Sequence, residues 1–256
     1  MEKENLKFRD SNIFEGMTSL SALLNSTCGN DRRIKEVWID EQKRRAKAKE
    51  IGFLTAKSKE RGFAISFVPT EKIDQIATGS SHGGILAFCT DRTLPILTSL
   101  QIEENGFYVF LEGIEDPFNF GYTLRSLYAA GVSGVVLSPR NWMNAAGVVA
   151  RASAGASELL PMYVSSAENV IPIFRERGYL TLCAGIRDSV SVFEEQFPLP
   201  LLLVIGGEKR GISRTVLDQA DRIVRIDYGR EFRGSLSAAS AATVLAFEIL
   251  RQNRKK

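Results

Sequence analysis

The chain has 256 residues, of which 44% are hydrophobic and 25% charged, a balance typical of a globular protein with one large domain or two smaller ones. No apolar run reaches the roughly 18–20 residues of a membrane-spanning helix, and Met1–Asp10 lacks the apolar stretch of a secretory signal, so a cytoplasmic location is expected. The net charge of +3 does not by itself indicate binding of nucleic acid. A single histidine, His82, excludes a multi-histidine metal site. The three dispersed cysteines form no disulfide framework.

The first 90 or so residues predict a small unit of alternating helices and strands. Apolar residues at helical spacing and short β-branched runs carry this prediction. The expected elements are a helix over Glu15–Asn25, a strand over Ile34–Ile39, a charged helix over Asp40–Arg61, a strand over Phe63–Val68, a helix over Thr70–Ala77 and, after a Gly-Gly turn, a strand over Ile85–Cys89. We interpret His82, in this glycine-rich turn, as a loop residue rather than a catalyst.

Basic residues gather between Arg32 and Arg61. This window holds eleven Lys and Arg against five Asp and Glu, a net of +6. Such a segment can meet the phosphates of a nucleic acid. It can equally be a solvated helix face with charge pairs one turn apart. Both interpretations stay open on the sequence alone.

The chain changes character after Thr90. Thr90–Glu104 contains Pro95 and has no polar-apolar period, which predicts a linker. We therefore expect an N-terminal domain over residues 1–92, a linker over 93–105 and a second domain over 106–256.

Strands and helices alternate throughout the second domain, which predicts an α/β fold with a mostly parallel sheet covered by helices on both faces. Leu201–Ile205 is apolar throughout, as a strand buried on both faces should be. The expected strands are Phe107–Leu111, Val132–Leu137, Leu160–Val164, Tyr179–Cys183, Leu201–Ile205 and Arg222–Ile226. One expected helix ends at Ala130. The others cover Asn141–Gly155, Ala167–Gly178, Ser213–Ala220 and Ser235–Gln252.

The segment Glu112–Gly131 leaves a strand and enters a helix through an acidic turn, where ligands bind in open α/β sheets. Asn119 lies at the start of this helix, and Arg125 follows four residues after Gly121. An arginine there offers a planar fork that matches a phosphate or carboxylate. The alternative is a helix-capping asparagine and a surface arginine.

Two further segments have the composition of a ligand site. In Leu201–Ser213 a buried strand ends in Gly206-Gly207 and then Glu208, and glycines there let a ligand approach the backbone. The spacing is neither that of a phosphate-binding P-loop nor GxGxxG. In Arg225–Glu248 a polar loop precedes a helix that we expect to open at Ser235 with small residues. The alternative for this segment is plain capping by Ser235 and tight packing.

The order and spacing of these segments resemble the three signature motifs of the SpoU/TrmH family of RNA 2′-O-methyltransferases. Asn119, Gly121 and Arg125 resemble the family's N-x-G-x-x-x-R, and Val148–Pro161 resembles the segment between its first two motifs. Gly206 and Glu208 resemble its G-x-E turn, and Ser235-Leu236 its Ser-Leu-Asn stretch. The resemblance covers Phe107–Gln252. It extends more weakly over residues 15–90, which look like the family's accessory substrate-binding domain.

The resemblance implies a trefoil-knotted α/β domain, S-adenosylmethionine as methyl donor, no metal, an rRNA or tRNA substrate and a homodimer. It implies that the cofactor is bound by Gly206, Gly207, Ile226, Leu236 and Ser237. It implies that catalysis depends on Arg125, Asn119, Glu208 and Ser235. Arg125 would act with a substrate phosphate, oriented by Ser235 and Glu208.

Two positions depart from the family pattern. Ser237 stands where the family has asparagine, and Asp227 where it usually has proline. They motivate a second hypothesis, a non-catalytic RNA-binding protein that keeps the methyltransferase fold. A nucleotide-dependent dehydrogenase is a third hypothesis, against which the missing GxGxxG speaks. Binding of S-adenosylmethionine would separate the first hypothesis from the second.

Overall fold

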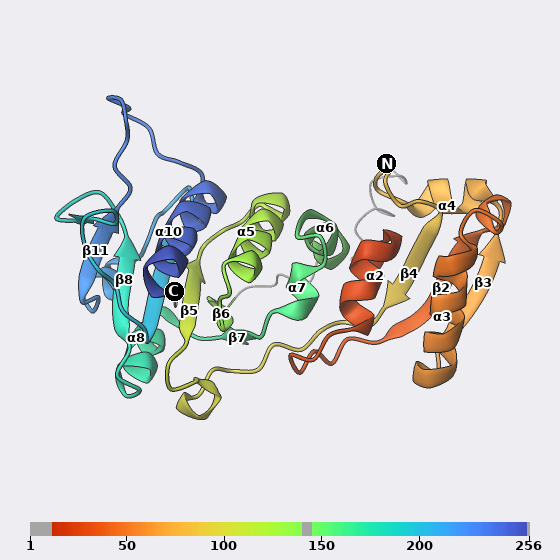
Figure 1. Cartoon of the computed structure of the whole chain (residues 1–256), viewed down its shortest axis with the longest axis horizontal. Helices are drawn as coiled ribbons and strands as arrows, with labels where there is room; N and C mark the ends of the chain where they lie inside the picture. The colour runs from red at the N-terminus through yellow and green to blue at the C-terminus, as the bar shows by residue number, and fades with distance from the viewer. Residues whose placement is uncertain (1–11, 140–144, 255–256) are drawn as a thin grey trace. The chain divides into compact units, whose positions relative to one another are not determined.

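The structure of the chain is a computed structural model that describes residues 12–139 and 145–254. It divides into two compact units (Figure 1). The first comprises Met1–Thr93 with Asn141–Leu159, and the second Leu94–Arg140 with Leu160–Lys256. Residues 145–159, the described part of the segment that interrupts the second unit along the chain, thus pack with the first.

The first unit is a small α/β layer structure with a four-stranded sheet in the order β1-β4-β2-β3. Strands β2 and β3 run parallel, and the other neighbours are antiparallel. Its strands are β1 (Ile13–Glu15), β2 (Ile34–Asp40), β3 (Ala64–Val68) and β4 (Ile85–Cys89). Its helices are α2 (Gly16–Leu24), the 3-10 helix η1 (Glu41–Lys43), α3 (Ala48–Arg61), α4 (Thr70–Ile76), α6 (Ala146–Ala152) and α7 (Ala156–Leu159).

Helix α3 begins later than predicted, at Ala48 instead of Asp40. The Asp40 carboxylate accepts hydrogen bonds from the backbone N–H of Gln42 and the hydroxyl of Thr70, both at 3.0 Å. These bonds hold the chain after β2 in the 3-10 turn η1, so the α-helix starts only after it. Strand β1 was not predicted, because three residues are too few to show a period.

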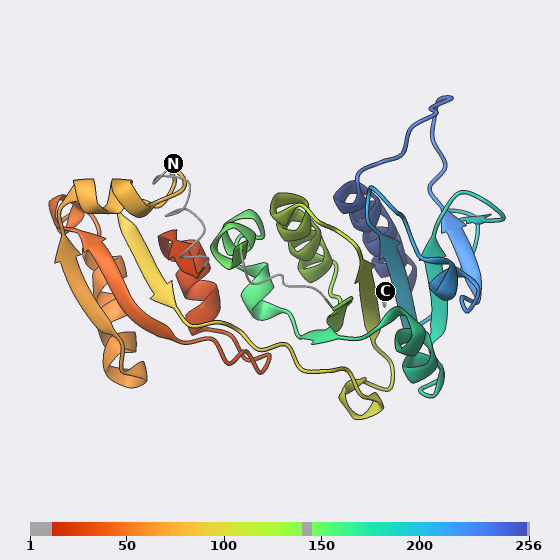
Figure 2. The same ribbon diagram turned by 180° about the vertical axis from the view of Figure 1, so that it is seen from behind.

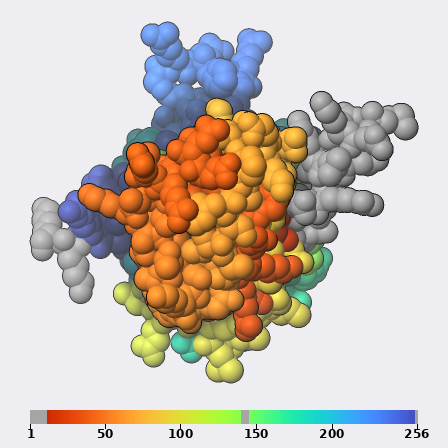
Figure 3. Space-filling model, turned by 90° about the vertical axis from the view of Figure 1, so that its right-hand side faces the viewer, coloured from red at the N-terminus to blue at the C-terminus, as the bar shows by residue number. Residues whose placement is uncertain are grey.

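The basic window lies on β2, η1 and α3, in the part of the chain whose atoms are orange in Figure 3. Lys47 pairs with Glu50 at 2.8 Å and Lys57 with Glu60 at 2.6 Å, each one helical turn apart. These pairs agree with the interpretation of a solvated helix face. The interpretation as an RNA contact stays a prediction.

A buried ion pair joins α7 to the rest of the first unit. Arg32 Nε lies 3.1 Å from Glu158 Oε2, and the two side chains are only 2% and 3% exposed. Arg92, also buried, donates to the carbonyl of Ser157 at 2.5 Å. Because an unpaired buried charge is strongly destabilising, these bonds explain why this distant segment packs here.

The predicted helix Asn141–Gly155 is shorter in the structure. Its residues 141–144 lie outside the described part of the chain, and α6 ends at Ala152. Ala154 and Gly155 then have positive φ angles of 51° and 86°, which break the helix before α7. A Cβ on Gly155 would lie 2.4 Å from Cβ of Ala22 in α2, so this crossing needs glycine.

His82 lies in the turn before β4, as expected of a loop residue. Its imidazole is buried, and Nδ1 accepts a hydrogen bond from the backbone N–H of Gly84 at 3.1 Å. The side chain thereby shapes the turn. No helix among the described residues has the length and apolar character needed to cross a membrane.

The second unit is built on a seven-stranded parallel sheet in the order β7-β6-β5-β10-β8-β11-β9. Its strands are β5 (Phe107–Glu112), β6 (Gly134–Leu137), β7 (Met162–Val164), β8 (Leu180–Ala184), β9 (Val190–Ser191), β10 (Leu201–Gly206) and β11 (Arg222–Arg225). Its helices are the 3-10 helix η2 (Ser99–Gln101), α5 (Pro117–Ala129), α8 (Ala167–Arg175), α9 (Arg214–Leu217) and α10 (Ala238–Asn253).

Helices cover both faces of this sheet (Figures 1 and 2). Phe174 of α8 and Val216 of α9 pack on Tyr108, Phe110 and neighbouring residues of one face. On the other face α10 returns to lie beside α5, where Thr243 Oγ1 donates to Ser126 Oγ at 2.7 Å. The predicted fold class, a parallel α/β domain with a smaller N-terminal α/β unit, is confirmed, and the knot stays a prediction.

Two stretches of the second unit differ locally from expectation. In the stretch predicted as a linker, Leu97 and Ile102 are buried in the core below α8, on either side of η2. The last helix begins at Ala238 and not at Ser235, because the Ser237 hydroxyl caps it by accepting from the N–H of Ser240. A serine at this position ends the preceding extended chain and satisfies a free N–H of the first turn.

Candidate functional site

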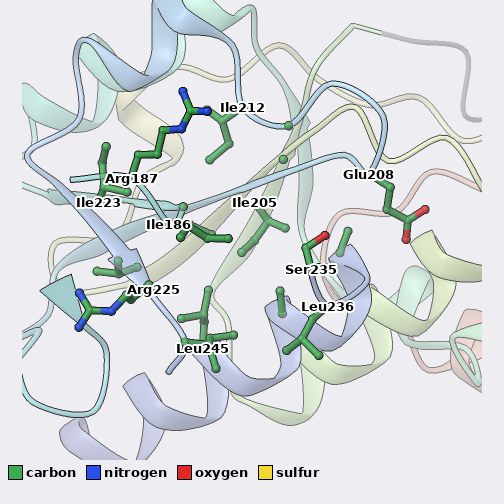
Figure 4. Close-up of a pocket in the computed structure, with 18 of the residues that line it drawn as sticks. Ile186, Arg187, Ile205, Glu208, Ile212, Ile223, Arg225, Ser235, Leu236 and Leu245 are labelled. Atoms are coloured by element: carbon green, nitrogen blue, oxygen red, sulfur yellow. The ribbon is translucent and has the colours of Figure 1, made fainter. Parts of the chain in front are cut away.

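A cavity of about 470 Å³ opens in the second unit at the carboxyl ends of β10, β8 and β11 (Figure 4). Three loops and the start of α10 enclose it. Its lining consists mainly of Ile205–Glu208 and Gly211-Ile212 after β10, Ala184–Arg187 after β8, Ile223–Ile226 and Tyr228 at the end of β11, and Ser235-Leu236, Ala238, Ala241 and Leu245 around the start of α10. The carboxyl ends of parallel strands are where α/β proteins bind their ligands.

Close backbone contacts require the two glycines at the end of β10. A Cβ on Gly206 would lie 2.4 Å from the carbonyl carbon of Gly211, and one on Gly207 only 2.0 Å from the carbonyl oxygen of Gly113. The N–H of Gly207 donates to the carbonyl of Glu112 at 2.7 Å, and that of Gly211 to the carbonyl of Gly207 at 2.8 Å. The chain therefore folds back on itself beside the cavity in a way that no larger residue permits.

Six of the nine site residues predicted from the sequence lie around this cavity. They are Gly206, Gly207, Glu208, Ile226, Ser235 and Leu236. They come from the second and third motif segments, which meet because β10 and β11 flank β8 in the sheet and α10 starts beside them. Asn119, Arg125 and Ser237 are not among the lining residues.

Asn119 reaches the cavity through a hydrogen bond. Its Nδ2 donates to Glu208 Oε1 at 2.9 Å. Asp116 is the N-cap of α5 and accepts from the backbone N–H of Asn119 at 2.7 Å, so the interpretation of Asn119 as the cap is wrong. With the cap supplied by Asp116, the Asn119 amide is free to hold the Glu208 carboxylate at the rim of the cavity.

Arg125 lies two turns further along α5 and is exposed to solvent. Within the described residues it forms no hydrogen bond or ion pair, so its guanidinium can contact an external anion. Ser237 serves as the cap of α10, its hydroxyl 3.2 Å from the N–H of Ser240. Serine and asparagine are about equally good N-caps. Ser237 therefore still caps the helix although the family has asparagine at this position.

The loop after β8 was missed as part of the site. Ile186 and Arg187 line the cavity, and Arg225 and Tyr228 line it from the end of β11 (Figure 4 labels the first three). The only signal in the sequence was Gly185, two residues after the predicted strand Tyr179–Cys183. Within the described residues, no group of three or more His, Cys, Asp or Glu side chains is placed to hold a metal ion.

Asp227 ties the end of β11 to β9. Its carboxylate accepts hydrogen bonds from the Ser191 hydroxyl and from Arg225 Nε, the latter at 2.7 Å. Arg225 also donates to the carbonyl of Ser189 at 2.5 Å. The Ser191 hydroxyl first, and Arg225 second, lower the pKa of Asp227 below its ordinary value. Where the family pattern has a proline, this chain therefore fixes the cavity wall with side-chain hydrogen bonds.

Replacing Asp227 by asparagine is expected to lower the melting temperature at pH 7, because the ion pair with Arg225 is lost. A carboxylate with a lowered folded pKa stabilises the fold above its ordinary value of 3.8 and loses this effect as the pH falls through the folded value. The gap between wild type and variant should thus be steady above about pH 5 and narrow below about pH 4. Thermal unfolding over this range measures the gap, and a gap that widens in acid contradicts the assignment.

A parallel sheet with an apolar cavity, floored by glycines at the strand ends, defines the class of α/β enzymes that bind a nucleotide-like small molecule. Comparison with known proteins gives the family. The sequence model of the SpoU rRNA Methylase family matches residues 106–247, and that for RNA 2′-O ribose methyltransferase substrate binding matches residues 13–95. The chain belongs to the SpoU rRNA methylase family and is an S-adenosylmethionine-dependent RNA methyltransferase, as its motifs predicted.

Relatives match along almost the whole chain. YacO of Bacillus subtilis, assigned to the TrmH family of tRNA/rRNA methyltransferases, is 29% identical over 88% of this chain and 91% of its own. A relative in Staphylococcus haemolyticus, assigned to the same family, is 30% identical over 87% of this chain and 90% of its own. The AdoMet-bound rRNA methyltransferase of Sinorhizobium meliloti shares the fold, with a TM-score of 0.76 over 98% of this chain and 94% of its own at 21% identity.

Proposed function

We propose that the chain transfers a methyl group from S-adenosylmethionine to a ribose 2′-hydroxyl of rRNA or tRNA. The meeting of the second and third motif segments around one cavity, with Asn119 of the first bonded to Glu208 at its rim, carries this proposal. The cavity volume of about 470 Å³ lies within the range of pockets for ligands of this size. Its walls combine isoleucine and leucine side chains with bare glycine backbone, which suits an adenosine base and ribose. The residues present therefore fit the methyl donor.

Both backbone groups and side chains hold the methyl donor. Gly206, Gly207 and Leu236 offer backbone groups, Ile226 offers an apolar wall, and Ser237 fixes the start of α10. S-adenosylmethionine, when bound, supplies an electrophilic methyl group. The apolar walls around it limit the access of water, which would otherwise compete with the ribose oxygen.

The polar residues act on the RNA. Arg125 has too high a pKa, above about 12, to serve as a base. Its fork instead binds the phosphate beside the target ribose and holds the 2′-oxygen in line for attack, while that phosphate accepts the hydroxyl proton. Glu208, held by Asn119 at 2.9 Å, and Ser235 orient the guanidinium. Most of the acceleration then comes from positioning.

The exposed face of α5 supports a homodimer. Phe118, Tyr122 and Tyr128 are exposed on the same side of the helix as Arg125, and α10 beside it exposes Phe247. Large exposed apolar side chains gathered in this way mark an interaction surface. A second copy of the chain covers this face and completes the RNA site around Arg125.

Replacing Tyr122 by glutamate is expected to turn the dimer into a monomer and to lower methyl transfer by at least about tenfold, because a buried unpaired charge is costly. The conservative change Tyr122→Phe keeps the ring and should keep both properties. Sedimentation measures the mass, and methyl incorporation measures the activity. A Tyr122→Glu protein that is still dimeric would place the interface elsewhere.

The domains predicted from the sequence have separate tasks in this proposal. Residues 1–92 form the RNA-binding domain, 93–105 a linker and 106–256 the methyltransferase domain. The substrate-binding family model over residues 13–95 supports this division. Because rRNA and tRNA are modified where they are made and used, the same proposal favours the cytoplasm.

Incubation with labelled S-adenosylmethionine and total rRNA or tRNA tests the function. Label should enter the RNA, and the modified nucleotide should resist alkaline cleavage, which requires a free 2′-hydroxyl. Label in a base, with normal alkaline cleavage, would refute the ribose as target. RNA binding without any uptake of S-adenosylmethionine, measured by calorimetry, would instead support the non-catalytic RNA-binding protein.

A further inference from the structure

The chain between β11 and α10 makes a long excursion away from the sheet, visible in Figures 1 and 2 as the blue loop. Its middle, Tyr228–Gly234, is unusually rich in aromatic and basic residues for so short a segment. Phe232 is 58% exposed and Tyr228 is 37% exposed. Two large rings displayed on a surface loop contribute nothing to the core, so they call for a function outside it.

The two rings form an ordered pair. Their centroids are 5.8 Å apart and their planes are inclined by 57°, a favourable aromatic geometry. The Phe232 ring also lies against Gly234, where an added Cβ would come within 2.5 Å of it. A side chain at position 234 would therefore displace the ring from this place. The two rings thus already lie together without a ligand.

The ring pair is anchored at the cavity of the methyl donor. The Tyr228 hydroxyl accepts a hydrogen bond from the N–H of Leu236 at 3.2 Å. Tyr228 and Leu236 both line the cavity, whereas Phe232 does not. One ring thus borders the reaction site, and the other extends from it into solvent.

Positive charge accompanies the rings. Arg230 and Arg233 flank Phe232 on either side, both are exposed, and the loop has one acid, Glu231, against them. Within the described residues neither arginine forms a hydrogen bond or ion pair. Exposed rings with unpaired arginines beside them are the combination by which proteins hold unpaired nucleotides, through stacking on the base and contact with the phosphates.

We propose that Tyr228 and Phe232, with Arg230 and Arg233, form a stacking platform for an unpaired nucleotide of the RNA next to the methylated ribose. The platform rests on the proposed function, since it needs an RNA substrate at this cavity. It favours targets in loops or single strands, because a base inside a duplex cannot stack on a protein ring. It contacts RNA at a place separate from Arg125 on α5.

Replacing Phe232 by alanine tests the platform. Affinity for a fluorescein-labelled, A-rich single-stranded RNA of about 12 nucleotides, measured by anisotropy, should fall about tenfold, the size expected for one stacked base. Affinity for the same strand in a duplex should hardly change. Phe232→Tyr keeps a ring and should bind like wild type. Phe193→Ala removes a ring of similar exposure (49% against 58%) outside the loop and serves as the matched control.

The other results each decide the proposal. Unchanged single-strand affinity of Phe232→Ala overturns it. An equal loss for duplex RNA also overturns it, because stacking would not be the cause. A calorimetric loss of S-adenosylmethionine affinity, or a change from dimer to monomer, would reassign the ring to the cofactor or to the partner copy. A wild-type protein that binds single-stranded RNA through Phe232 but never transfers methyl groups would refute the proposed function and leave the platform standing.

Discussion

Alanine in place of Arg125 is expected to lower the rate of methyl transfer by a factor on the order of 100 or more. The affinity for S-adenosylmethionine should stay near that of wild type. The two effects separate because Arg125 is exposed on α5 and is not among the residues that line the cavity. Removing it leaves the donor pocket intact but takes away the fork that fixes the substrate phosphate. Single-turnover methyl transfer to RNA and calorimetry with the donor measure the two quantities.

Two further variants sharpen this test. Arg125→Lys keeps the charge but loses the two-pronged geometry, so it should recover only a small part of the rate. Arg214→Ala removes another exposed arginine, on α9, and should retain full activity. Near wild-type transfer by Arg125→Ala would show that the assignment is wrong. A matching loss of donor affinity would show that Arg125 acts on the donor rather than on RNA.

The sequence predicted the second unit well where burial and period coincide. Leu201–Ile205 is apolar throughout and forms β10, the central strand between β5 and β8, with every residue of that run buried. A strand covered on both faces has no other composition available to it. The two-residue strand β9 shows no period and was missed, since its position depends on the side chains of Ser191 and Asp227.

The errors at the starts of α3 and α10 have one physical origin. Asp40 and Ser237 each supply a side-chain acceptor that competes with, or caps, the helical backbone, and each moves a predicted start by several residues. Sequence periodicity reports the apolar face of a helix. It does not report which of several neighbouring polar residues serves as the cap.

The candidate site was predictable in its motifs but not in its walls. Gly206 and Glu208 carry a recognisable spacing, whereas Ile186 and Arg187 enter the cavity only because β8 lies between β10 and β11. Strand order is a property of the whole sheet, and no local pattern contains it. Tyr228 could not be predicted either, because its contact with the cavity involves a hydrogen bond with Leu236 that no local pattern contains.

Of these substitutions, Gly207→Ala is expected to lower the stability of the fold most. It is also expected to abolish binding of the methyl donor. The new Cβ would lie 2.0 Å from the carbonyl oxygen of Gly113 and 2.4 Å from its carbon, both backbone atoms that no side-chain movement can clear. Overpacking of this kind costs about 1–3 kcal/mol, occasionally more. Relief would require the turns at Gly113 and Gly207 to separate, which breaks the 2.7 Å hydrogen bond from Gly207 to Glu112 and opens the cavity wall.

Gly52→Ala provides the opposite case within the same chain. Gly52 lies inside α3 with no atom within 4 Å of an added Cβ, so alanine there should stabilise the fold by about 0.5–1 kcal/mol. Urea unfolding of both variants, with calorimetry for the donor, measures the contrast. Equal stability of the two variants would mean that the β10 turn can relax. Normal donor binding by Gly207→Ala would mean that this turn is no part of the methyl-donor pocket.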